Sequence, residues 1–308
     1  MLIDDVNGTR LNVIDEGEGH ALLLLPGMGG SWREWKHQLD RLSDRYRCLV
    51  IEHRGHGRSE RTTGRYSIDM FADDAAAVCR ALDVTHAHVA GLAMGGMVGL
   101  GLALRHRWLV DSLVVANTAA RLEPSFRQGL DAIARFVREQ GFADTPVTGG
   151  TTAGVAWSPT TVRRRPEVIR DHRRDALSTD PDVYARAALA VAQFDVAERL
   201  GEIRVPTLVL WGDHDVLVPR SYSEVLRDGI AEAEMMVVPD AGHLCTIEQP
   251  EVVARTMAAF FERYPCLPDR DTSEAEERDG TPTALSTSAA SSSSPSSSSD
   301  ALTAAVRR

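Results

Sequence analysis

The sequence predicts an α/β fold, with a mainly parallel, doubly wound sheet and helices on both of its faces. Strand-like and helix-like segments alternate over residues 1–117 and again over residues 201–265, as they do in chains built from parallel strands. Several of the strand-like segments are continuous apolar runs, which is typical of strands buried on both faces. Between the two regions, residues 118–200 hold helical patterns without a buried strand. We therefore expect a helical insertion that caps the carboxyl ends of the strands, where such sheets bind ligands.

The first region begins with an antiparallel hairpin. Residues 2–6 and 9–14 have strand patterns on either side of Asn7-Gly8, a strong turn signal. Further strands are predicted at residues 21–25, 47–51, 86–90 and 113–116. Helical spacing of apolar residues predicts a helix that follows Ser31 and carries Trp32, Trp35, Leu39 and Leu42, and two more over residues 69–82 and 94–105.

The remaining elements divide the chain into a core, a cap and a tail. Helices are predicted at residues 126–140, 166–177 and 181–194 in the insertion, and at 221–230 and 251–264 after it. Strands are predicted at residues 205–211 and 235–238. Residues 1–117 and 201–265 thus form the core and residues 118–200 the helical cap. Residues 266–308 lose the apolar pattern and include a serine-rich tract, so we expect a disordered tail.

Charge and composition exclude several classes of function. The net charge of −10 repels phosphate backbones, so we expect no nucleic-acid partner. The chain has no run of eighteen apolar residues for a membrane span and no secretory pattern at its start, which favours a cytoplasmic location. The cysteines have no zinc-site spacing, and we expect reduced thiols and no metal: Cys48, Cys79, Cys245 and Cys266. The glycines also lack the G-x-G-x-x-G spacing of a dinucleotide site, so no cofactor is expected.

The junction between a predicted strand and a predicted helix at residues 91–96 carries the sequence GLAMGG. It matches the nucleophile elbow G-x-S-x-G, except that Ala93 stands at the serine position. The central residue of such an elbow occupies strained backbone at the tip of a sharp turn. Gly91 and Gly95 allow the strand and the helix to approach closely.

Two later loops supply an acid and a base in the order that this elbow requires. Asp213 and Asp215 follow the strand at residues 205–211, and His243 follows the strand at residues 235–238. The chain order is therefore nucleophile position, acid, histidine. His243 is the candidate general base, and a carboxylate on its other nitrogen would fix its tautomer. We favour Asp215 over Asp213 for that carboxylate.

Together these loops resemble the α/β-hydrolase family over about residues 1–265. The segment LPGMGG at residues 25–30 is similar to the family's oxyanion loop, with Pro26 in place of the frequent histidine. The segment RGHGRS at residues 54–59 is similar to the loop after the next strand, although Glu52 replaces the usual aspartate. Within the family, ANTAA at residues 116–120 is similar to the 3-oxoadipate enol-lactonases. The resemblance implies that the backbone N–H groups of Met28 and Met94 are the oxyanion donors.

Ala93 departs from the family at the central position, because a methyl group cannot attack a carbonyl carbon. Losing the serine of a serine hydrolase costs about 10⁶-fold in turnover in the best-studied case. Either Ala93 is an engineered replacement of a serine, or it is natural and the site works without a covalent step. Cys245 is a poor substitute nucleophile, since it lies two residues after His243 in the same loop.

Other side chains are candidates for substrate binding. Trp32 and Trp157 could line the pocket, although buried tryptophans more often serve packing. An arginine-rich stretch could clamp a carboxylate on a small-molecule substrate, or it could be the solvated face of a helix: Arg163, Arg164, Arg165, Arg170, Arg173 and Arg174.

Three functions fit these residues. The first is a hydrolase for a small-molecule ester or lactone, in which His243 and Asp215 activate water. The second is a cofactor-free lyase, isomerase or oxygenase that uses His243 as a base over the oxyanion hole. The third is a non-catalytic protein that binds a ligand in the same pocket. Retention of both Asp215 and His243 favours an enzyme.

Overall fold

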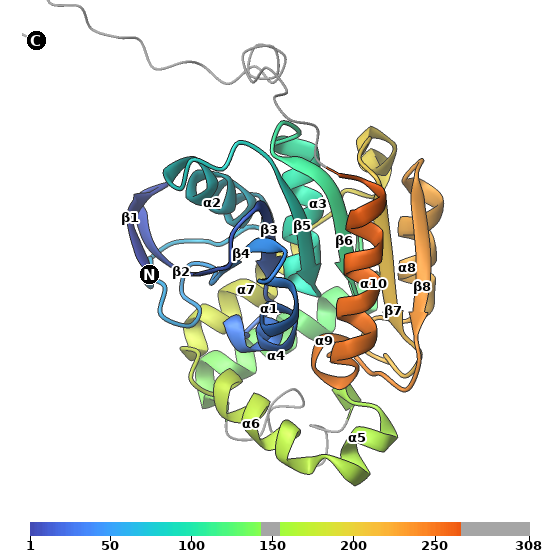
Figure 1. Ribbon diagram of the computed structural model, residues 1–308. Helices are drawn as coiled ribbons and strands as arrows, with labels where there is room; N and C mark the ends of the chain where they lie inside the picture. The colour runs from blue at the N-terminus through green and yellow to red at the C-terminus, as the bar shows by residue number, and fades with distance from the viewer. Residues whose placement is uncertain (143–154, 266–308) are drawn as a thin grey trace, which may run out of the picture.

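The computed structural model describes residues 1–142 and 155–265. A single eight-stranded sheet runs through the molecule in the order β1-β2-β4-β3-β5-β6-β7-β8 (Figure 1). Its strands are β1 (Leu2–Val6), β2 (Thr9–Glu16), β3 (His20–Leu25), β4 (Tyr46–Ile51), β5 (Ala87–Leu92), β6 (Val110–Ala116), β7 (Thr207–Gly212) and β8 (Ala233–Val238). Within this sheet, the pairs β1–β2 and β2–β4 are antiparallel and the other five pairs are parallel. The predicted fold class, a mostly parallel sheet led by a hairpin, is confirmed.

Helices cover both faces of the sheet (Figure 1). On one face, α1 (Lys36–Leu42) and α10 (Pro250–Arg263) bury Leu39 and Phe261 against the strands. On the other, α2 (Ile68–Ala81), α3 (Met94–Arg105) and α8 (Arg220–Gly229) contribute to a second apolar cluster. The long apolar runs of β3 and β5 are buried completely because both faces of these central strands are covered.

Among the described residues between β6 and β7 are four α-helices that we call the cap helices: α4 (Pro124–Gln140), α5 (Pro159–Arg164), α6 (Pro166–Ala176) and α7 (Pro181–Gln193). They gather at one end of the sheet, at the bottom of Figure 1, beyond the carboxyl ends of the parallel strands. Each begins with a proline, whose fixed φ suits the first helical turn and whose missing N–H costs nothing there. Among the described residues of this segment, no strand joins the sheet.

Some short elements differ from the sequence-based expectation. Ser31 does cap a helix, but its first turn is the 3₁₀ helix η1 (Trp32–Trp35), and α1 begins only at Lys36. Helix α5, the 3₁₀ helix η3 (Ala197–Glu202) and α9 (Cys245–Glu248) have no counterpart in the sequence pattern. Each spans four to six residues, which is too short for a helical repeat of apolar residues to be visible.

Two expectations concern other parts of the chain. The tail proposed for residues 266–308, with Cys266, lies outside the described residues. Among the helices that the structure does describe, none has the length and apolar character needed to cross a bilayer.

Gly95 makes the strand–helix junction possible, and this gives a prediction about stability. A Cβ at position 95 would lie 2.0 Å from the carbonyl oxygen of Leu25, a backbone atom that cannot turn aside. We expect Gly95→Ala to lower the free energy of unfolding by about 2 kcal/mol or more in urea denaturation. Gly129→Ala in α4 is the matched control, because nothing lies within 4 Å of its Cβ. The control should be neutral or more stable by about 0.5–1 kcal/mol. Equal losses in both variants would refute the packing argument.

Candidate active site

The site begins at the turn between β5 and α3, where Ala93 adopts φ 51° and ψ −113°. Positive φ costs a residue with a Cβ about 1–3 kcal/mol, and such strain collects at functional sites. Two contacts hold the turn in place: the Ala93 N–H donates to the carbonyl of Ala116 at 2.9 Å, and Thr118 Oγ1 donates to the Ala93 carbonyl at 2.6 Å. This strained turn is the conformation predicted for the centre of a nucleophile elbow, and its side chain is a methyl group.

Asp215, which is buried, pairs with the partly buried His243 beyond the ends of β7 and β8. His243 Nδ1 lies 2.9 Å from Asp215 Oδ2, and Asp215 Oδ1 accepts the N–H groups of Leu217 and Val218, each at 2.9 Å. Burial by itself would lower the pKa of His243, but the Asp215 carboxylate, helped by Glu34 and Glu248, raises it above its usual value. Because Nδ1 is engaged, Nε2 is the nitrogen left for a reacting group.

Asp213, the alternative acid, and Cys245, the alternative nucleophile, do not have the surroundings that these roles require. Asp213 Oδ1 accepts the N–H of Ala241 at 3.2 Å. Cys245 begins α9 and is fully buried, and burial raises the pKa of its thiol, whereas a nucleophilic thiol needs a lowered pKa. Neither residue lines the cavity described below.

Asn117 holds the three loops together, a role that sequence reasoning missed. Its side-chain Nδ2 donates to the carbonyls of Gly242 at 3.0 Å and His243 at 2.7 Å, and its Oδ1 accepts the N–H of Gly212 at 2.9 Å. Asn117 is fully buried and has φ 47°, which asparagine tolerates better than most residues. This amide therefore fixes the loop after β8 against the ends of β6 and β7.

A cavity of about 470 Å³ opens beside Ala93 and His243. Much of its wall is apolar and comes from both the core and the cap helices: Met97, Phe126, Leu130, Ile133, Trp157 and Leu217. Its polar lining includes Glu34, Asn117, Thr118, His172 and His243. Such a space suits a small apolar molecule that is oriented by a few polar groups.

Met28 and Met94 line this cavity, as Ala93 does. Met94 is the first residue of α3, so its N–H has no partner within the helix. The loop that carries Met28 is fixed by His53, whose Nε2–H donates to the Pro26 carbonyl at 3.1 Å. Burial lowers the pKa of His53 to about 3, so this ring is neutral at ordinary pH. The N–H groups of Met28 and Met94 are the ones that the resemblance to the family assigns as oxyanion donors.

Glu34 is a second carboxyl in the cavity that sequence reasoning missed. It lies in η1, is 3% exposed, and its Oε2 accepts the N–H of Gly27 at 2.7 Å. Burial raises the pKa of Glu34 to about 7; the Gly27 N–H opposes that rise, the Asp175 carboxylate adds to it, and His243 opposes it. The only sequence signal was a glutamate between two tryptophans after a glycine loop. The Glu34 side chain points toward the cavity because of how η1 packs, which the sequence does not show.

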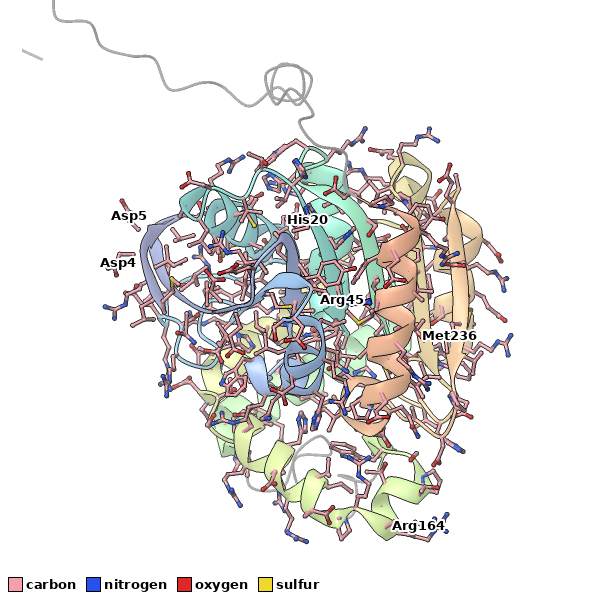
Figure 2. The ribbon with its side chains drawn as sticks, in the orientation of Figure 1. Asp4, Asp5, His20, Arg45, Arg164 and Met236 are labelled. Atoms are coloured by element: carbon pink, nitrogen blue, oxygen red, sulfur yellow. The ribbon has the colours of Figure 1, made fainter. Side chains whose placement is uncertain are left out.

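Of the side chains that the sequence suggested for substrate binding, Trp157 lines the cavity and the others do not. Trp157 is buried and lines the cavity, whereas Trp32 does not line it. No arginine or lysine is among the described lining residues, which supports the second reading of the arginine-rich stretch, a solvated helix face, over a carboxylate clamp. Arg165 instead donates to the carbonyls of Glu248 and Ile247, and Arg164 projects from the outer end of α5 (Figure 2). Arg164 therefore belongs to the solvated surface of the cap helices, whereas Arg165 helps to attach these helices to the core.

One group of side chains has the donor atoms of a metal site. His20 Nε2 and His86 Nδ1 each lie 3.1 Å from Asp111 Oδ2, and the three ligand atoms fall within 4.8 Å of one another. His20 lies on the part of the sheet away from the cap helices (Figure 2). The carboxylate already pairs with both imidazoles, so the group has a structural explanation without an ion. Sequence spacing could not reveal it because His20 lies in β3, His86 just before β5 and Asp111 in β6, far apart in the chain.

Known proteins resemble this chain in both sequence and structure. Residues 20–250 match the family model described as alpha/beta hydrolase fold. The 3-oxoadipate enol-lactonase 2 of Acinetobacter baylyi is 30% identical over 245 residues, which cover 79% of this chain and 89% of the relative. A proposed carbamate hydrolase, RutD, from a Caulobacter strain is 33% identical over 242 residues, 78% of this chain and 90% of the relative. The solved structure of a thermophilic esterase from Thermogutta terrifontis superposes with a TM-score of 0.80, at 30% identity over 86% of this chain and 99% of that one.

Proposed function

Because the chain belongs to the α/β-hydrolase fold family, we propose that it hydrolyses a small-molecule ester or lactone by direct attack of water. The observation that carries this proposal is the hydrogen bond of 2.9 Å between His243 and the buried Asp215, beside a cavity that also contains Ala93. The pair has the arrangement of a general base with its orienting carboxylate. A water molecule in the space of the missing hydroxyl would take the place of the serine.

The proposed reaction has two steps. In the first, the water oxygen bonds to the substrate carbonyl carbon while His243 Nε2 takes one of its protons. The imidazolium that forms is stabilised by Asp215, and the N–H groups of Met28 and Met94 hold the oxyanion. In the second, the bond from carbon to the leaving oxygen breaks, that oxygen takes up a proton from an acidic side chain of the site, and the proton held by His243 restores that side chain. An ester then gives an acid and an alcohol, and a lactone gives one hydroxy acid.

The cavity favours a substrate without charge. Its wall is largely apolar, its described lining lacks a cationic arginine or lysine, and Glu34 would repel a carboxylate when ionised. We therefore propose an ester or lactone with an apolar acyl part and no carboxylate. The relatives act, by their names, on an enol-lactone and a carbamate, which differ in polarity, so the cavity of this chain is the better guide to its substrate.

A panel of neutral and carboxylate-bearing esters and lactones, analysed by mass spectrometry, tests this function. We expect products with the mass of one added water from neutral substrates, and no acyl adduct on the intact protein at any time. Products of unchanged mass would instead indicate isomerisation, the second reaction that His243 could support. Recovery of every compound unaltered, with binding detected by calorimetry, would replace the enzymatic proposal with a ligand-binding one.

A further inference from the structure

Glu34 and Asp215 are both carboxyl groups close to His243, and their surroundings differ strongly. Asp215 takes part in three hydrogen bonds, to His243 and to two backbone N–H groups. Glu34 accepts a single hydrogen bond among the described residues, from Gly27, and is otherwise enclosed beside an apolar cavity. Burying a carboxylate with so few partners is costly, so the protonated form of Glu34 is favoured. This contrast is the one that separates acids from stabilising carboxylates in enzymes.

Glu34 is also placed beside the nucleophile position. A Cβ built on Gly27 would lie 3.4 Å from Glu34 Oε2 and 3.6 Å from Ala93 Cβ, so the carboxyl group and the alanine methyl flank the same glycine. A Cβ built on Gly30 would lie 2.3 Å from Glu34 Oε1, so the carboxyl group occupies space that only a glycine leaves open. The oxyanion loop thus has room for this carboxyl group at the edge of the reaction centre.

We propose that the protonated carboxyl of Glu34 is the general acid that protonates the leaving oxygen, while His243 is the base that activates water. This assignment rests on the proposed hydrolysis. The site then contains a separate proton donor and proton acceptor, and direct attack by water can use the acceptor in its first step and the donor in its second.

The protons balance over one turnover. His243 Nε2 takes a proton from the attacking water as the new C–O bond forms. As the old C–O bond breaks, the Glu34 hydroxyl proton passes to the leaving oxygen, which leaves Glu34 as a carboxylate and His243 as an imidazolium. Transfer of the proton from His243 to Glu34 through the cavity then restores both groups. The net change is the consumption of one water molecule.

Several charged and titratable groups set the pH range in which this pair works. Asp175 of α6 faces Glu34, and its negative charge favours the protonated acid. Asp215 and Glu248 face His243, as does His172, whose pKa burial lowers to about 4. Burial raises the pKa of Glu34 to about 7, so the fraction of protonated Glu34 declines as the pH rises through that value. We therefore expect activity toward alkyl esters to decline above about pH 7.

Glu34→Gln tests the assignment because glutamine keeps an oxygen for the Gly27 N–H but cannot transfer a proton. Two esters of one acyl group are compared, an alkyl ester and a 4-nitrophenyl ester. The alkyl ester needs an acid for its poor leaving group, so its kcat should fall about 100-fold or more. The nitrophenolate leaves without help, and its kcat should change by less than about tenfold. The declining limb of the pH profile near pH 7 should disappear with the alkyl ester.

Asp175→Asn is a second variant that leaves Glu34 in place. Removing the neighbouring negative charge lowers the pKa of Glu34, so the declining limb should move to lower pH. Equal loss with both esters in Glu34→Gln, full activity in that variant, or an unmoved limb in Asp175→Asn would each overturn the role of Glu34. Absence of hydrolysis of both esters by the unmodified chain would instead overturn the proposed function, and the acid assignment that rests on it.

Discussion

The Ala93→Ser variant is expected to react covalently with a fluorophosphonate probe, whereas the unmodified chain stays unlabelled. Residue 93 already has the strained backbone of an elbow, with φ 51°, so a new hydroxyl would project from the same place as the present methyl group. His243 lines the cavity beside it, with Nδ1 on Asp215 and Nε2 left to accept the serine proton. We expect the labelling rate to rise by about 10³-fold or more.

The remaining parts of the site support the same result. The N–H groups of Met28 and Met94 belong to the main chain, so the substitution does not change them, and they would hold the phosphoryl oxygen of the adduct. The double variant Ala93→Ser/His243→Ala is the control, and its labelling should be lost because the serine has no base. A folded Ala93→Ser protein that stays unlabelled would show that the site no longer supports a nucleophile. Labelling that persists in the double variant would show that His243 is not the base.

The second large effect is expected from Asp215→Asn and His243→Ala in the unmodified chain. Removing the general base should lower turnover of a neutral ester by about 10²–10⁴-fold. Asp215→Asn should have a comparable effect because an amide that donates to Nδ1 forces the wrong tautomer; the same change costs about 10⁴-fold in a serine protease. Steady-state kinetics with one neutral ester measures both variants.

Asp213→Asn is the matched control for the second prediction. Asp213 lies two residues from Asp215 but bonds to the N–H of Ala241 and does not line the cavity, so its loss should leave turnover within about threefold of the unmodified chain. A large defect in Asp213→Asn with a small one in Asp215→Asn would contradict the assignment of the acid. Unaltered turnover in His243→Ala would remove the base from the proposed mechanism.

The sequence alone determined the fold class and the order of the loops. Its alternation of apolar runs and helical spacing depends on the backbone repeats of strands and helices, which are local properties. The elbow could be located from the sequence because, at this one turn, other backbone atoms lie so close to Gly91 and Gly95 that a side chain would not fit. The positions of Asp215 and His243 followed from where strands β7 and β8 end, since parallel strands bring their carboxyl ends to one edge.

Only the tertiary structure decided which side chains meet. It paired His243 with Asp215, placed Glu34 in the cavity, and left Arg164 on the surface of the cap helices. It also joined Asn117 to the loops after β7 and β8, 95 to 126 residues further along the chain. Contacts over such separations depend on how whole elements pack and which way each side chain then points. No local repeat in the sequence encodes that direction, so the chemistry of the cavity became visible only in the folded chain.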